Sequence, residues 1–69
     1  MDINTLIEQA KQKYGAGEYT AAADLFLQAA EAYNNLQDDL NAAEMKNNQS
    51  VALLRAGKAE GALHATDGT

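Results

Sequence analysis

The 69-residue sequence contains no cysteine, proline or tryptophan, and it has a single histidine, His64. Without cysteine there can be no disulfide and no thiolate metal site, and one histidine cannot form a histidine-rich metal centre. Five Lys and Arg side chains stand against ten Asp and Glu, which gives a net charge of −5. This balance argues against nucleic acid and against membrane surfaces as partners, because both attract clustered positive charge.

Long hydrophobic runs are also missing, the longest being residues 21–23 and 51–54. A membrane-spanning helix needs about 20 apolar residues, so we expect no transmembrane segment. Residues 1–4 lack the basic start of a signal peptide, and we therefore expect a cytoplasmic protein. A chain of this length forms one domain at most (residues 1–69), and its core is marginal.

Alanine is abundant, with 15 residues, whereas β-branched residues are few, and this composition predicts an all-α protein. Apolar residues recur at helical spacing in residues 3–14, and the glycines at 15 and 17 are expected to end that helix. A second helix is expected over about 19–36, so that residues 3–36 form a first helix pair. The apolar stripes of the two helices consist of Ile3, Leu6, Ile7, Ala10, Tyr14, Ala22, Phe26, Ala29, Tyr33 and Leu36.

A third helix is expected over about 40–56, with Asp38 or Asp39 as its N-cap. We expect Gly57 to end it and a partial fourth helix to follow over about 59–65, which makes about three and a half helices. The main apolar stripe of the third helix is expected to comprise Leu40, Ala43, Val51 and Leu54, with Ala42, Met45, Ala52 and Leu53 beside it.

The sequence contains an internal repeat. When it is compared with itself at an offset of 40 residues, Gly17 aligns with Gly57 and Ala22 with Ala62. The run from Gly17 to Ala22, followed by Phe26 and Ala29, resembles the tetratricopeptide repeat (TPR). A second, less regular copy covers residues 48–63. The offset of 40 is similar to the longer-helix TPRs of kinesin light chains and of adaptors with Leu-Gly-Asn repeats. The Ala-rich second helix is similar to that of the soluble attachment proteins of vesicle fusion.

The resemblance implies antiparallel helix-turn-helix repeats, a TPR-like α-solenoid segment with an incomplete second helix pair over 40–66. It also implies a protein-protein interaction module whose concave face, formed by the first helix of each pair, binds a peptide or partner protein. Asn48 corresponds to an Asn with which family members often hold the ligand backbone. Ile7 and Lys11 stand where a carboxylate clamp has Lys and Asn, so we expect no such clamp. The residues expected to line the groove are Lys11, Glu44, Asn48 and Arg55.

No residue pattern indicates an enzyme, and we expect no catalytic, metal or cofactor site. His64 lies near the C-terminal end and is interpreted as a solvated surface residue. The adjacent Asp38 and Asp39 are explained by helix capping and by the helix dipole. Gly15 and Gly17 follow a helix, whereas a phosphate loop follows a strand and is followed by Lys.

The sequence is compatible with two functions and with two folds. The chain is either an interaction module or a purely structural first turn of a longer solenoid, with no ligand of its own. A three-helix domain like those of microtubule-interacting-and-transport proteins is the competing fold. Because repeat arrays bury their faces against neighbouring repeats, we expect these residues to be the N-terminal part of a longer repeat protein, or a trimmed product. In isolation they are expected to self-associate or to swap helices.

Overall fold

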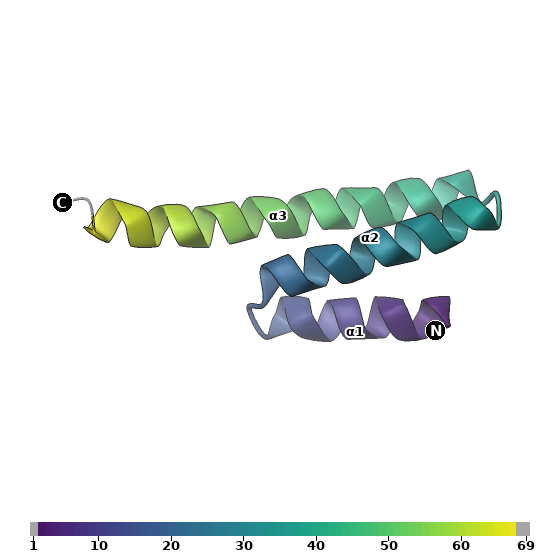
Figure 1. Ribbon diagram of the computed structural model, residues 1–69, viewed down its shortest axis with the longest axis horizontal. Helices are drawn as coiled ribbons and strands as arrows, with labels where there is room; N and C mark the ends of the chain where they lie inside the picture. Colours follow the sequence, from purple (N-terminus) through teal and green to yellow (C-terminus); the bar gives the residue numbers. More distant parts are fainter. Residues whose placement is uncertain (1, 68–69) are drawn as a thin grey trace.

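The computed structural model describes the backbone of residues 2–67 and the side chains of residues 2–57. Within that range the expected all-α class is confirmed, with three helices: α1 (Ile3–Gly15), α2 (Tyr19–Asn35) and α3 (Asp39–Asp67). α1 and α3 run in the same direction, and α2 runs between them in the opposite direction (Figure 1). The molecule is an elongated layer measuring 48 × 19 × 12 Å.

The turn between α1 and α2 is a Schellman motif that depends on Gly17. Its φ is +82°, in the left-handed region that residues with a Cβ rarely adopt. The N–H of Gly17 donates to the Tyr14 carbonyl at 3.1 Å, and the N–H of Glu18 donates to the Lys13 carbonyl at 2.9 Å. These two bonds satisfy carbonyls that the end of α1 would otherwise leave without partners. The expected end of the first helix at the glycine pair is confirmed.

The turn between α2 and α3 repeats this motif without a glycine. Gln37 has φ +59° and donates its N–H to the Asn34 carbonyl at 3.0 Å, while Asp38 donates to the Tyr33 carbonyl at 2.9 Å. Asp38 is also the N-cap of α3, because its Oδ1 accepts the backbone N–H of Asn41 at 3.3 Å. Of the two expected caps, the structure therefore selects the first.

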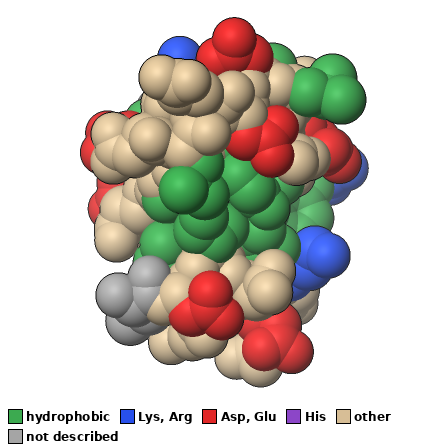
Figure 2. All heavy atoms as spheres, turned by 90° about the vertical axis from the view of Figure 1, so that its right-hand side faces the viewer, with side chains coloured by type: hydrophobic (Ala, Val, Ile, Leu, Met, Phe, Trp, Pro, Cys, Tyr) green, Lys and Arg blue, Asp and Glu red, His purple; other side chains and the backbone are tan. Residues whose placement is uncertain are grey.

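Alanine dominates the buried core, and in the end-on view of Figure 2 hydrophobic side chains gather near the centre, with polar and acidic ones around them. Phe26, at 5% exposure, is the largest buried side chain, and Leu6 and Met45 are the other large ones among the described residues. Small side chains allow neighbouring helices to approach closely, so α2 packs against both α1 and α3. The remaining buried residues are Ala10, Ala22, Ala23, Ala29, Ala30, Ala42 and Ala52.

α3 does not end at Gly57, and this expectation was wrong. The helix continues for 29 residues to Asp67, so no separate fourth helix forms over 59–65. A single glycine weakens a helix by only about 1 kcal/mol relative to alanine, and its neighbours Ala56, Lys58 and Ala59 are strong helix formers. The C-terminal part of α3 extends beyond the turn that joins α1 and α2 (Figure 1).

The face of α3 that packs on α2 also differs from the expected one. Ala42, Met45 and Ala52 are buried, whereas the expected stripe lies on the opposite side of the helix, with Leu40 82% and Leu54 59% exposed. The Ala-rich surface of α2 is best filled by the small and flexible side chains of α3. α3 therefore carries apolar residues on two opposite faces, of which one is buried.

Candidate peptide-binding groove

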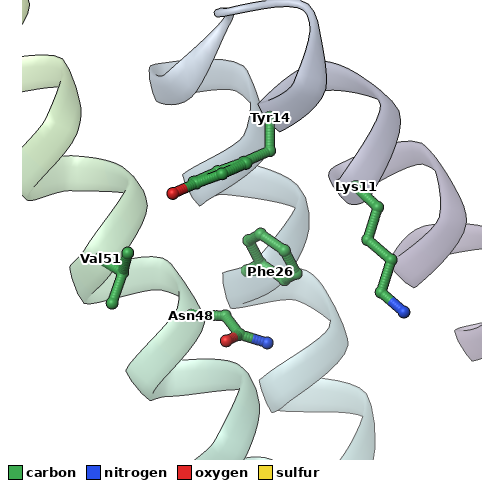
Figure 3. A pocket seen from close by; sticks show the side chains of 5 residues that line it. All are labelled: Lys11, Tyr14, Phe26, Asn48 and Val51. Carbon is green, nitrogen blue, oxygen red and sulfur yellow. The ribbon is translucent and has the colours of Figure 1, made fainter.

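A groove of about 330 Å³ lies between α1 and α3, with α2 beneath it. Figure 3 shows Phe26 of α2 at the centre, Tyr14 and Lys11 on the side of α1, and Asn48 and Val51 on the side of α3. Phe26, Tyr14 and Val51 provide apolar surface, while Asn48 and Lys11 add an amide and an ammonium group. An open apolar floor with a few polar groups around it is the usual composition of a ligand site.

Tyr14 closes one end of the groove and is held there by two contacts. Its ring meets that of Tyr19 edge to face, with centroids 5.2 Å apart and an interplanar angle of 73°. The Arg55 guanidinium of α3 lies over the Tyr14 ring, 5.6 Å from its centroid, in a cation–π contact across the groove. The Schellman turn at Gly17 reverses the chain and so brings Tyr19 back to Tyr14.

Phe26 forms the floor because its neighbours on α2 are so small. Ala22 and Ala29, one turn to either side, are completely buried. They let the flanking helices approach α2, and the larger phenyl ring of Phe26 lies at the centre of the groove between α1 and α3 (Figure 3). The floor is therefore a consequence of one aromatic residue within an alanine stripe.

Asn48 is the polar group best placed to bind a ligand. Its side chain is partly buried, and among the described side chains none forms a hydrogen bond with its amide. A primary amide can donate and accept at the same time, which matches the N–H and C=O groups of a peptide bond. Lys11 is exposed on the opposite wall and supplies a positive charge. Lys11 and Asn48 thus line the groove from opposite walls (Figure 3).

The structure brings three of the four expected groove residues together. Lys11 and Asn48 line the groove, and Arg55 reaches across its end to Tyr14. Glu44 lies one turn before Asn48 on α3, is exposed and does not belong to the lining. On sequence alone Tyr14, Phe26 and Val51 belong to the apolar stripes of their helices. Each of them has an apolar side chain on a helix face, and nothing in that pattern distinguishes a core residue from a groove residue.

The part of the chain that the structure describes contains no group of three or more His, Cys, Asp or Glu side chains that could hold a metal ion. No helix in that part has the length and apolar character needed to cross a membrane. The side chain of His64 lies outside the described residues, as do those of Ala62 and Leu63.

Comparisons with protein-family models, with curated proteins and with solved structures give no match for this chain.

Proposed function

We propose that this chain is a protein-protein interaction module that binds a peptide in the groove between α1 and α3. The observation that carries the proposal is the combination of an apolar floor, formed by Phe26 and Tyr14, with the unengaged amide of Asn48. A bulky apolar side chain of the ligand lies on the aromatic floor, and Asn48 binds the ligand backbone. Lys11 favours an acidic residue next to that apolar one.

A TPR-like identity for the first helix pair is part of this proposal. Its support is the antiparallel α1–α2 pair (Figure 1), the left-handed Gly17 at the turn and the fully buried Ala10, Ala22 and Ala29 in the core. The second copy has weaker support, because its glycine, Gly57, lies inside the continuous α3. The cytoplasmic location, for which the sequence without cysteine is the support, also belongs to the proposal.

The arrangement of the helices favours a repeat over the alternative three-helix domain. In a closed three-helix bundle each helix packs against both others. Here α2 packs against α1 and α3, while the groove separates α1 from α3. Such a layer with one concave side is the arrangement that repeat proteins use for binding.

The proposal is tested by selecting a ligand from a random dodecapeptide library displayed on phage. Binding of the selected peptide is then measured by calorimetry for the wild type, for Asn48→Ala and for Gln28→Ala, a control on the exposed side of α2. We expect Asn48→Ala to weaken binding roughly 5- to 150-fold, because a lost hydrogen bond that leaves a partner unsatisfied costs about 1–3 kcal/mol. Gln28→Ala should bind like the wild type.

The same experiment distinguishes peptide binding from the alternative that the chain is a purely structural segment. If the selection yields no peptide, or if Asn48→Ala and Gln28→Ala bind equally well, the groove is not a peptide site. The chain would then serve as a solenoid segment without a ligand of its own. Because a carboxylate clamp is not expected, amidation of the peptide's C-terminus should leave its affinity unchanged.

A further inference from the structure

The side of α3 that faces away from α2 carries a second apolar stripe. Leu40, Val51 and Leu54 are 82%, 38% and 59% exposed, although large apolar side chains are normally buried. Ala43 and Asn47 are exposed between them. With 3.6 residues per turn these five positions fall on one line along the helix, about 21 Å long, and none of them carries a charge. We call Leu40, Ala43, Asn47, Val51 and Leu54 the outer stripe.

The spacing of the outer stripe is symmetric. Its residues follow one another at intervals of 3, 4, 4 and 3, so that Asn47 is the midpoint. When the two-fold axis is perpendicular to two identical helices, the helices meet antiparallel, and each position faces its mirror position on the other copy. Because the spacing reads the same in both directions, every position of the outer stripe faces another position of the outer stripe in such a pair.

We propose that the outer stripe is the dimerisation surface of this protein and that a second copy of the chain packs on it antiparallel. Leu40 of one copy then meets Leu54 of its partner at both ends. Ala43 meets Val51, a small residue opposite a larger one. The two Asn47 side chains meet on the axis, where each amide donates to and accepts from the other and so fixes the register.

The surrounding structure is consistent with this partner. The face of α3 that packs on α2 consists of Ala42, Met45 and Ala52, so the second copy takes no residue from the existing core. The chain is acidic overall, with a net charge of −5, and an uncharged stripe is a part of its surface that two copies can bring together without direct repulsion. Val51 is shared between the outer stripe and the groove wall, so the second copy borders the groove.

The first test is the mass of the wild-type chain by sedimentation equilibrium, together with two variants. At about 100 µM, above the micromolar dissociation constants of modest interfaces, we expect twice the 7.3 kDa mass of one chain. Leu54→Glu should raise the dissociation constant about tenfold or more, because each copy would place a carboxylate in the interface. Leu53→Glu is the matched control: Leu53 is also exposed, at 48%, but lies off the stripe, and this variant should remain a dimer.

The second test determines the orientation by disulfide formation, for which the natural sequence, without cysteine, is well suited. Under mild oxidation Asn47→Cys should form a covalent dimer with itself. Leu40→Cys should not, but a mixture of Leu40→Cys and Leu54→Cys should. A monomeric wild type at about 100 µM, equal loss of association in Leu53→Glu and Leu54→Glu, or self-linking of Leu40→Cys would each overturn the proposal. Asn48→Ala, the groove variant, should dimerise normally, which keeps this test separate from that of peptide binding.

Discussion

At the scale of single residues, the two turns show how one backbone shape is produced by two different side chains. Gly17 and Gln37 both occupy the left-handed region and both donate the same type of hydrogen bond to the end of the preceding helix. Glycine adopts this conformation without steric penalty, whereas a residue with a Cβ pays roughly 1–2 kcal/mol. The second turn is therefore strained by comparison with the first.

Replacing these residues should change stability in opposite directions. Gln37→Gly is expected to raise the free energy of unfolding by about 0.5–1 kcal/mol, because it removes the strain of the left-handed conformation. Gly17→Ala should lower it by about 1 kcal/mol, although a Cβ at that position would meet nothing within 4 Å. Urea unfolding followed by circular dichroism measures both changes, and Gly15→Ala, inside α1, is the control that should be neutral or slightly stabilising. If Gly17→Ala and Gly15→Ala changed the stability equally, the left-handed conformation of Gly17 would be contradicted.

At the scale of the elements, the sequence predicted α1, α2 and the turns between the helices well, because each signal is local. Gly17 after α1 and Asp38 before α3 act within one helical turn, and the apolar spacing of α1 gives its buried face directly. The errors arose where the outcome depends on contacts. Leu40 and Leu54 are more apolar than Ala42 and Ala52, yet the smaller residues fit the alanine surface of α2 and are the buried ones.

Gly57 shows that a glycine can either end a helix at a turn or lie inside a continuous helix. It lies 40 residues after Gly17 and 20 after Gln37, at the position where a third turn of the same spacing would fall. In the structure it is part of α3, has no positive φ, and a Cβ built there meets nothing within 4 Å. The sequence favours a turn at this glycine, and the run of helix formers around it outweighs that preference.

Gly57→Ala therefore separates a continuous helix from a turn. In the continuous helix alanine is the better residue, and we expect the variant to be more stable by about 0.5–1 kcal/mol and to have higher helicity by circular dichroism. If Gly57 instead adopted the left-handed conformation of Gly17, the same substitution would be destabilising by a similar amount. The sign of the change decides between the two.

At the scale of the whole molecule, the helices form a thin layer that buries few large apolar side chains. The described core contains one buried aromatic residue and seven alanines, and each alanine removes little apolar area from water. The groove between α1 and α3 lies on the concave side of this layer. The outer stripe of α3 is exposed as well. The sequence could indicate Lys11 and Asn48 as groove residues through the family resemblance. It could not show that Phe26 is the floor, because that depends on the separation of α1 and α3.

Because a marginal monomer gains stability from a partner that binds only the folded state, folding and dimerisation should be coupled. We expect the melting temperature of the wild type to rise by roughly 5 °C for each tenfold increase in chain concentration, given an unfolding enthalpy of about 0.7 kcal/mol per residue. Leu54→Glu should melt at one temperature at all concentrations, while Leu53→Glu should keep the dependence. Calorimetric scans across two decades of concentration measure the slope. A wild-type slope of zero would mean that the layer is stable alone and that the outer stripe contributes nothing to it.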